Sequence, residues 1–183
     1  MKPESGRIAL IGGMAAGKSS VGKALAGLIG LPFVDLDDEI SHVAAMSIQA
    51  IFDAEGESGF RSRESGALAG IASRRGAFVL ACGGGIVLSP ENRAILRDGF
   101  FTVWLQVDAT EALRRANAQG AARPLLRVSD QLTELESILT ARKELYRACA
   151  DMEFDSGAAS DPIETAGALL KAIGARRFPG AGL

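Results

Sequence analysis

The run Gly12 to Ser19 reads GGMAAGKS and has the spacing G-x-x-x-x-G-K-[ST] of a phosphate-binding loop. It follows the apolar residues 8–11, which predict a strand, and precedes residues 20–29, which have a helical pattern. The inward backbone N–H groups of such a loop and the positive end of the next helix dipole attract phosphate oxygens. Lys18 would contact the β- and γ-phosphates, and the Ser19 hydroxyl would bind Mg²⁺. These residues predict a nucleoside triphosphate site, with a glycine-rich strand-to-helix turn as the alternative.

A pair of carboxylates follows the second predicted strand. Asp35 and Asp37 are two residues apart, so an extended backbone would place both side chains on the same side. Such a pair suits a site in which one carboxylate holds Mg²⁺ through water and the other accepts the proton or hydrogen bond of a substrate hydroxyl. The alternative is helix capping by Asp37 or Asp38, with a helix that starts near Glu39. The two interpretations are compatible.

Three consecutive glycines, Gly83 to Gly85, follow the apolar run 77–82. Glycines at a strand end allow backbone N–H groups to approach a ligand closely, although a loose turn would also explain them. The strand has no acidic residue of the Walker B type at its end. We therefore expect Mg²⁺ to be held by Ser19 and the Asp35–Asp37 pair.

Three arginines that are far apart in the sequence complete the candidate chemistry: Arg61, Arg123 and Arg142. A guanidinium makes planar, two-pronged contacts with carboxylates and phosphates that a lysine cannot imitate. Each arginine taken alone is more simply explained as a solvated surface residue, and it is their agreement with one another in a family pattern that favours a site.

The elements that must position these residues alternate between strand and helix patterns. This alternation predicts an α/β protein whose parallel sheet has right-handed crossovers and helices on both faces, with ligands at the carboxyl ends of the strands. The predicted strands are residues 7–11, 32–34, 77–81, 100–105 and 152–154. Helices are predicted to begin at Ser89-Pro90, near Asp130 and at Asp161-Pro162.

Length and composition restrict the class of protein. A chain of 183 residues suits one domain, and a net charge of −2 gives no electrostatic reason to expect nucleic acid or membrane partners. Cys82 and Cys149 lack metal-ligand spacing and are most simply free thiols of a reducing compartment. No apolar run approaches the ~20 residues of a membrane span. We expect a cytoplasmic protein that acts as a monomer.

With these residues in hand, the chain resembles the shikimate kinases, which are small members of the nucleoside monophosphate kinase-like P-loop group. The resemblance covers residues 8–155. The phosphate loop is shared with many unrelated NTPases, whereas the other blocks in this order are characteristic of the family. The matching blocks are G-x-x-x-x-G-K-S at 12–19, D-x-D at 35–37, I-F-x-x-x-G-E-x-x-F-R-x-x-E at 51–64, G-G-G at 83–85, R-P-L-L at 123–126 and R-x-x-L-Y at 142–146.

The resemblance implies a P-loop kinase fold, with three α/β/α layers and a five-stranded parallel sheet in the order 2-3-1-4-5. It implies a single domain over 1–183 with a core at about 7–175. Within that domain, a substrate-binding segment is expected at about 36–64, a lid at about 116–127 and a frayed tail at 176–183.

The resemblance also implies an activity: transfer of the γ-phosphoryl group of ATP to the 3-hydroxyl of shikimate, with Mg²⁺, giving shikimate 3-phosphate and ADP in chorismate and aromatic amino acid biosynthesis. The catalytic residues it implies are Lys18, Asp37 and Arg123. The shikimate-binding residues it implies are Asp37, Phe52, Phe60, Arg61, Gly83, Gly84, Gly85 and Arg142. The nucleotide-binding residues are Gly12, Ala15, Ala16, Gly17, Lys18, Ser19, Ser20, Arg115 and Arg123, and the metal-binding residues are Ser19 and Asp35.

A few positions depart from the family pattern. Ala15 stands where a glycine is frequent, Ser41 and Ala45 stand where Glu and Gly are common, and Ser160 replaces a basic residue of some relatives. No proposed catalytic group is lost. The alternatives that stay open are a kinase for another carboxylate-bearing polyol, such as gluconate or aminoshikimate, and a nucleotide-binding relative without catalytic activity.

Overall fold

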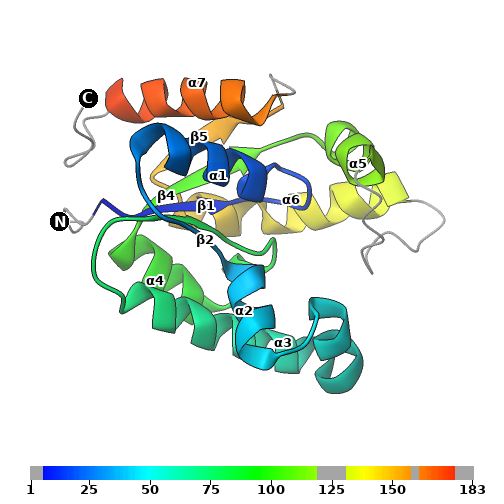
Figure 1. The fold of residues 1–183 in the computed structure, drawn as a ribbon. Helices are drawn as coiled ribbons and strands as arrows, with labels where there is room; N and C mark the ends of the chain where they lie inside the picture. Colours follow the sequence, from blue (N-terminus) through cyan, green and yellow to red (C-terminus); the bar gives the residue numbers. More distant parts are fainter. Residues whose placement is uncertain (1–5, 119–130, 158–160, 176–183) are drawn as a thin grey trace.

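The computed structural model describes residues 6–118, 131–157 and 161–175 (Figure 1). Its strands form one five-stranded sheet in the order β2-β3-β1-β4-β5, and every neighbouring pair is parallel, which confirms the predicted topology. The strands are β1 (Ile8–Ile11), β2 (Phe33–Asp35), β3 (Val79–Ala81), β4 (Phe101–Gln106) and β5 (Met152–Asp155).

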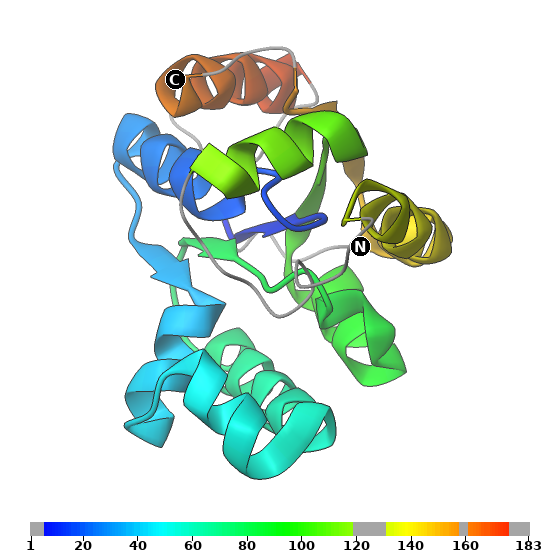
Figure 2. The same ribbon diagram turned by 90° about the vertical axis from the view of Figure 1, so that its right-hand side faces the viewer.

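Helices cover both faces of this sheet, so the molecule has the three predicted layers. Figures 1 and 2 show α1 and α7 together on one side, with α3 and α4 on the other. The helical elements are α1 (Lys18–Ile29), α2 (Leu36–Ala44), α3 (Ile48–Ala72), η1 (Ile86–Leu88), α4 (Pro90–Gly99), α5 (Ala109–Ala118), α6 (Gln131–Cys149) and α7 (Pro162–Ala175). No helix in the described ranges is long and apolar enough to cross a membrane.

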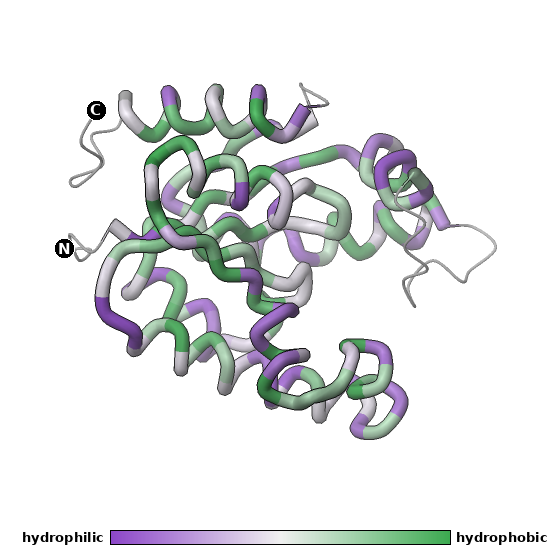
Figure 3. The backbone as a smooth tube through the Cα atoms, in the orientation of Figure 1, coloured by the Kyte–Doolittle hydropathy of each residue, from purple (hydrophilic) through white to green (hydrophobic). Residues whose placement is uncertain are grey.

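The core lies on the two faces of the central strand β1. Ala9 and Ile11 face the cluster formed with α3, α4 and α6, whereas Ile8 and Leu10 face the cluster formed with α1 and α7. All four residues are at most 2% exposed, because a parallel sheet covered on both faces has no solvated side. Figure 3 shows the same arrangement as hydrophobic strands inside and hydrophilic turns on outer helices such as α5.

Two helix starts follow the predicted capping chemistry. The Ser89 hydroxyl accepts the Asn92 N–H at 3.2 Å, with Pro90 as the first helical residue of α4. The Asp161 carboxylate accepts the Ile163 N–H at 3.1 Å at the start of α7. These contacts satisfy backbone donors that have no partner within the helix.

Several predicted boundaries were wrong by a few residues. β2 ends at Asp35 rather than at residue 34, and α2 starts directly at Leu36 rather than near Glu39. The helix can start early because Asp35 is its N-cap: the Asp35 carboxylate accepts the Asp37 N–H at 3.0 Å. Neither Asp37 nor Asp38 is therefore the cap. β3 starts at 79 rather than 77, and β4 lies one residue later than predicted.

Arg7 was predicted to begin the first strand, but it lies just before β1 and has a different task. Its guanidinium donates to the carbonyls of Ala72 at 2.8 Å and Gly76 at 3.2 Å, and also to that of Arg74. These carbonyls lie at and just after the end of α3, where no intrahelical donor remains for them. Arg7 thus fixes the C-terminal end of α3 against the first strand.

The predicted lid overlaps a helix and a part of the chain that is not described. Residues 116–118 form the last turn of α5, and the remaining lid residues, Arg123 among them, lie outside the described residues. Asp130, Ser160 and the tail 176–183 also lie outside them.

Candidate functional site

The phosphate loop connects β1 to α1, and its last residues contact the backbone of its first residues. Lys18, the first residue of α1, is only 9% exposed, and its ammonium donates to the Gly13 carbonyl at 2.6 Å. Gly17 has φ 86°, in the left-handed region that favours glycine, and it precedes the helix directly. Ala15 has φ 56°, so it adopts the left-handed conformation despite its β-carbon. The loop and the start of α1 therefore present backbone donors and one cation at the same point.

Ser19 and Asp35 meet beside this loop. The Ser19 hydroxyl donates to Asp35 Oδ2 at 2.6 Å, and the other oxygen of Asp35 accepts the Asp37 N–H. Hydroxyl and carboxylate oxygens are ligands that Mg²⁺ prefers, so the pair fits the predicted metal site. No cluster of three or more His, Cys, Asp or Glu side chains occurs within the described ranges. A Mg²⁺ ion at this pair would therefore take further ligands from phosphate and water.

Cys82 stands at the end of β3, where other phosphate-loop proteins have an acidic residue. It is 4% exposed, and burial raises the pKa of its thiol far above the ordinary value. A thiol that stays protonated is a poor nucleophile. Cys82 is therefore best described as a buried residue of the core beside the site.

A cavity of about 400 Å³ lies against the phosphate loop. Gly13 and Met14 of the loop contribute to its lining, as do Leu135 and Leu139 of α6. All of the residues implied for acceptor binding line the same cavity: Asp37, Phe52, Phe60, Arg61, Gly83, Gly84, Gly85 and Arg142. We call these residues, together with Glu64, the acceptor wall.

Asp37 enters this cavity from the first turn of α2. The prediction that Asp35 and Asp37 extend from the same side of an extended segment was wrong, because the chain turns into α2 immediately after Asp35. The turn separates their tasks. Asp35 faces Ser19, whereas Asp37 lines the acceptor cavity.

Arg61 is oriented by two carboxylates of its own helix. Its Nη1 lies 2.7 Å from Glu64 Oε2, its Nη2 lies 3.2 Å from Glu57 Oε1, and its guanidinium lies 5.2 Å from the centre of the Phe60 ring. The guanidinium also rests against Gly85, where any β-carbon would collide with it. Arg61 is thus held in one orientation at the edge of the cavity.

Glu64 is a site residue to which sequence reasoning assigned no role, although it closes the motif at 51–64. It is 1% exposed, and its Oε1 has no hydrogen-bond partner among the described atoms. Burial raises the pKa of its carboxyl above the ordinary value, Arg61 opposes this, and Asp37 adds to it. The signal in the sequence was its position three residues after Arg61, on the same helix face.

The glycine run is packed tightly rather than forming a loose turn. A β-carbon on Gly83 would lie 2.7 Å from Glu64 Oε1 and 3.2 Å from Asp37 Oδ1. The Gly84 carbonyl accepts the Tyr146 hydroxyl at 2.5 Å and Arg142 Nη1 at 3.2 Å. The absence of side chains at these positions lets both carboxylates and α6 approach the same backbone.

Tyr146 is the second residue whose role was missed. Its ring is 1% exposed and stacks on Trp104, with ring centres 5.5 Å apart. Burial raises the pKa of its hydroxyl, so the group remains a hydrogen-bond donor to the Gly84 carbonyl. Tyr146 and Arg142, one helical turn apart on α6, therefore hold the glycine run from one side.

The first arm of α3 folds over the cavity at Gly56, which has φ 69° and ψ −175°. Arg63 bridges this kink: its Nε and Nη2 donate to the two oxygens of Glu55 at 2.8 and 2.7 Å. The kink brings Phe52 onto Phe60, with ring centres 4.5 Å apart. Both aromatic rings line the acceptor cavity, so the kink shapes the acceptor wall.

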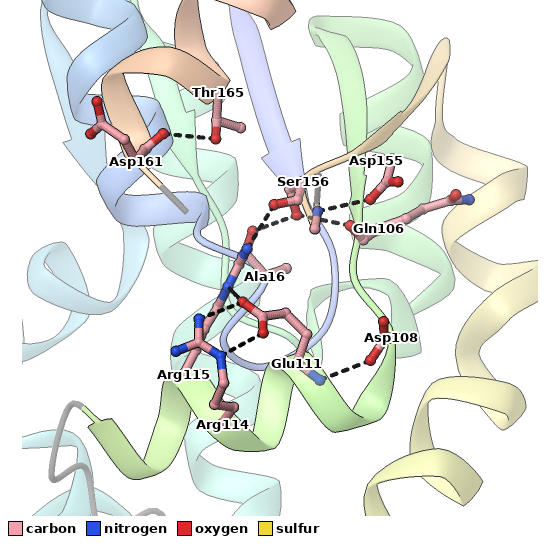
Figure 4. Close-up of polar contacts among 11 residues, drawn as sticks. Ala16, Gln106, Asp108, Glu111, Arg114, Arg115, Asp155, Ser156, Asp161 and Thr165 are labelled. Carbon is pink, nitrogen blue, oxygen red and sulfur yellow. Dashed lines mark hydrogen bonds and ion pairs between the residues drawn. The ribbon is translucent and has the colours of Figure 1, made fainter. Parts of the chain in front are cut away.

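Arg115 lies on the other side of the phosphate loop. Its Nε lies 2.6 Å from Glu111 Oε1, and its Nη2 donates to the Ser156 carbonyl at 2.9 Å (Figure 4). Its Nη1 would lie 3.9 Å from a β-carbon on Gly17. Gly12 to Ser19 together with Arg115 and Ser156 form what we call the donor wall. Ser156 was not predicted, because nothing in its sequence surroundings distinguishes it.

Known proteins are similar to this chain both in sequence and in overall fold. The sequence profile of the shikimate kinase family matches residues 14–173. A shikimate kinase of Thioalkalivibrio sulfidiphilus is 42% identical over 153 residues, which are 84% of this chain and 80% of that protein. One of Nitrosomonas europaea is 45% identical over 152 residues, covering 83% of this chain and 71% of that protein. The solved structure of shikimate kinase from Acinetobacter baumannii in complex with shikimate superposes with a TM-score of 0.87 at 36% identity, covering 93% of this chain and 94% of that one.

Proposed function

This chain belongs to the shikimate kinase family and catalyses the ATP-dependent phosphorylation of shikimate, and we propose that the transfer takes place in the cavity between the donor and acceptor walls. One observation carries the proposal. Gly13 and Met14 of the phosphate loop line the same cavity as Asp37, Arg61 and Arg142. A phosphoryl donor on the loop and an acceptor held by these side chains would therefore be in direct contact.

The acceptor wall suits a small ring that carries a carboxylate and hydroxyl groups. Arg61 and Arg142 both line the cavity, and guanidinium groups bind a carboxylate in a planar, two-pronged way. Phe52 and Phe60 offer an apolar surface against which the ring can lie. We assign the shikimate carboxylate to the two arginines and its ring to the two phenylalanines.

Asp37 is placed to receive the 3-hydroxyl. In the transfer, the hydroxyl oxygen forms a bond to the γ-phosphorus, the bond from that phosphorus to the β–γ bridging oxygen breaks, and the hydroxyl proton leaves. Asp37 holds the hydroxyl in line and accepts this proton or its hydrogen bond. Lys18 at the phosphate loop balances negative charge on the transferring group. The resemblance assigns a similar part to Arg123.

Ser19 and Asp35 are the residues that would hold Mg²⁺, Ser19 directly and Asp35 through water. Their oxygens lie 2.6 Å apart beside the loop, close enough to share one metal ion and its water shell. When bound, Mg²⁺ neutralises charge on the β- and γ-phosphates. Ser19→Ala should raise the Mg²⁺ concentration needed for half-maximal activity, whereas Ser73→Ala, which changes an exposed serine at the end of α3, should leave that concentration at the wild-type value.

We further propose that the chain acts as a monomer in the cytoplasm. The described groups of both walls come from one chain, so the site needs no second copy for them. Both cysteines are buried free thiols, which suits a reducing compartment. Sedimentation at working concentration tests the oligomeric state.

The function is tested by coupling ADP release to a spectroscopic signal with ATP, Mg²⁺ and a panel of acceptors. We expect turnover with shikimate and little with gluconate, whose open chain cannot lie as a ring on Phe52 and Phe60. Arg61→Ala should lose most of the activity, and Arg75→Ala, which changes an exposed arginine outside the cavity, should retain it. A higher kcat/KM for gluconate than for shikimate would contradict the assignment of the acceptor.

A further inference from the structure

Ser156 follows β5 and touches the phosphate loop although it lies 140 positions away in the sequence. It is 1% exposed, and its hydroxyl lies 2.9 Å from the Ala16 carbonyl and 2.8 Å from the Gln106 carbonyl. The Gln106 carbonyl already accepts the Ser156 N–H at 2.8 Å. A hydroxyl has one proton to donate, and we assign it to the Ala16 carbonyl.

This contact determines which way one peptide unit of the loop faces. A trans peptide is planar, so the Ala16 carbonyl and the Gly17 N–H point in opposite directions. A carbonyl fixed on Ser156 therefore turns the Gly17 N–H away from Ser156. Inward N–H groups of the loop are the donors that hold phosphate oxygens. The Ser156 hydroxyl thus orients a group that would touch the nucleotide, without touching the nucleotide itself.

The carbonyl of Ser156 contacts Arg115, the donor-wall residue that comes from α5. It accepts Arg115 Nη2 at 2.9 Å, while Glu111 holds Arg115 Nε at 2.6 Å (Figure 4). Hydrogen bonds from Arg114 and Arg115 lower the pKa of the Glu111 carboxyl to about 2, so Glu111 stays ionised at working pH. Arg115 is therefore held between α5 and the end of β5, next to Gly17.

We propose that Ser156 is a positioning residue for the nucleotide: its hydroxyl sets the Ala16–Gly17 peptide and its carbonyl sets Arg115. The proposal rests on ATP binding at the phosphate loop, which is part of the proposed function. It is independent of which acceptor the enzyme uses. Because both contacts converge on one side of the loop, Ser156 governs affinity for the nucleotide and not for shikimate.

The test is calorimetric titration of the full chain with ADP and, separately, with shikimate. Ser156→Ala removes the hydroxyl and leaves a buried carbonyl without its donor, so we expect the Kd for ADP to rise about three- to tenfold. The Kd for shikimate should stay within about twofold of wild type. Ser156→Thr keeps a hydroxyl and should restore most of the ADP affinity.

Thr102→Val is the matched control. The Thr102 hydroxyl is also buried and donates to a backbone carbonyl, that of Leu96, at 3.1 Å, but it has no contact with the loop. If Ser156→Ala does not fold, Ser156→Cys keeps the shape with a weaker donor and serves the same comparison. The proposal is overturned if Ser156→Ala binds ADP like wild type, or if it weakens ADP and shikimate equally. Failure of wild type to phosphorylate shikimate would instead contradict the proposed function, and it leaves the ADP titration unaffected.

Discussion

The donor wall and the acceptor wall meet at Gly13 and Met14, which line the acceptor cavity, but the two walls are built by different means. The donor wall relies on backbone groups held by short hydrogen bonds, such as Lys18 to the Gly13 carbonyl and Ser156 to that of Ala16. The acceptor wall relies on charged side chains, with Arg61 between Glu57 and Glu64. The donor wall should therefore be sensitive to changes of backbone conformation, and the acceptor wall to loss of single side chains.

The difference matches the ligands. Phosphate groups carry several charges and accept many hydrogen bonds, so a ring of N–H groups recognises them without regard to the rest of the molecule. An acceptor with one carboxylate must be distinguished by a few oriented groups. If the two walls are independent, a substitution in one should change affinity for one ligand only.

Lys18→Met gives the largest expected effect. The substitution removes the cation at the phosphate loop and keeps an apolar chain of similar length, so we expect kcat to fall about a thousandfold. The Kd for shikimate, measured calorimetrically, should stay near wild type because the acceptor wall is untouched. A kcat within tenfold of wild type would contradict the role of Lys18.

Arg61→Ala gives the next largest effect and has the opposite selectivity. The loss of one guanidinium removes charge-assisted hydrogen bonds to the acceptor and leaves Glu64 buried without its cation, so the KM for shikimate should rise about a hundredfold. The Kd for ADP should not change. Equal weakening of both ligands would mean that the two walls are coupled. Arg75→Ala is the control for the loss of a surface cation.

The two walls also differed in how far they could be predicted from the sequence. The phosphate loop is continuous, so its spacing alone predicted the turn, the following helix and the place of Lys18. The sheet order was predicted only through the resemblance, because alternation of strands and helices leaves several orders possible. The boundary at Asp35 was missed because a carboxylate that ends a strand and caps a helix looks like a member of an extended pair.

Glu64, Tyr146 and Ser156 could not be assigned roles from the sequence for a shared physical reason. Each acts by touching a residue far away in the chain or on another element: Glu64 lies at Gly83, Tyr146 at Gly84 and Ser156 at Ala16. Patterns of spacing describe neighbours within one element, whereas these contacts depend on how the elements pack. The glycine run indicated that another group approaches the backbone closely, but it did not indicate which side chain this is.

Glu64→Gln tests whether the affinity of the acceptor wall for shikimate depends on pH through the charge of Glu64. Wild-type Glu64 has a raised pKa, so it takes up its proton at a higher pH than an ordinary carboxyl and then loses its charge against Arg61. The KM for shikimate should rise about tenfold in Glu64→Gln at neutral pH. In wild type the KM for shikimate should rise as the pH falls and Glu64 takes up its proton, and in Glu64→Gln this rise should be absent.

The thermal stability of wild type and of Glu64→Gln gives a separate check, because stability and shikimate affinity should change in opposite directions as the pH falls. Because burial raises the pKa of Glu64 in the folded chain, its contribution to stability is present below the unfolded value and is lost as the pH rises through the folded value. The difference between the melting temperatures of wild type and Glu64→Gln should therefore shift in favour of wild type as the pH falls. Over the same range the affinity of wild type for shikimate should decrease. If both move in the same direction, Glu64 acts only through stability.

Arg63→Gln should give a smaller effect confined to the acceptor wall. The two-pronged Arg63–Glu55 contact crosses the kink at Gly56 but is solvent-accessible, so its loss should raise the KM for shikimate only about two- to threefold. The kinetic assay at low and high salt measures this difference, which should shrink as salt screens the pair. Arg97→Gln, on α4, is the control.

The smallest effects are expected at two alanines with left-handed backbones, one in the donor wall and one outside both walls. Ala15 in the loop has φ 56°, and Ala45 at the end of α2 has φ 52°. Glycine relieves the left-handed cost but loses more entropy on folding, so each Ala→Gly should raise stability by about 0.5 kcal/mol, or about 1–2 °C in Tm. Ala45→Gly should leave both ligands' affinities unchanged, because it only ends a helix. Ala15→Gly should gain the same stability yet weaken ADP binding about twofold, since the donor wall depends on a fixed backbone. If Ala15→Gly binds ADP as tightly as wild type, rigidity of the loop is not what distinguishes the donor wall.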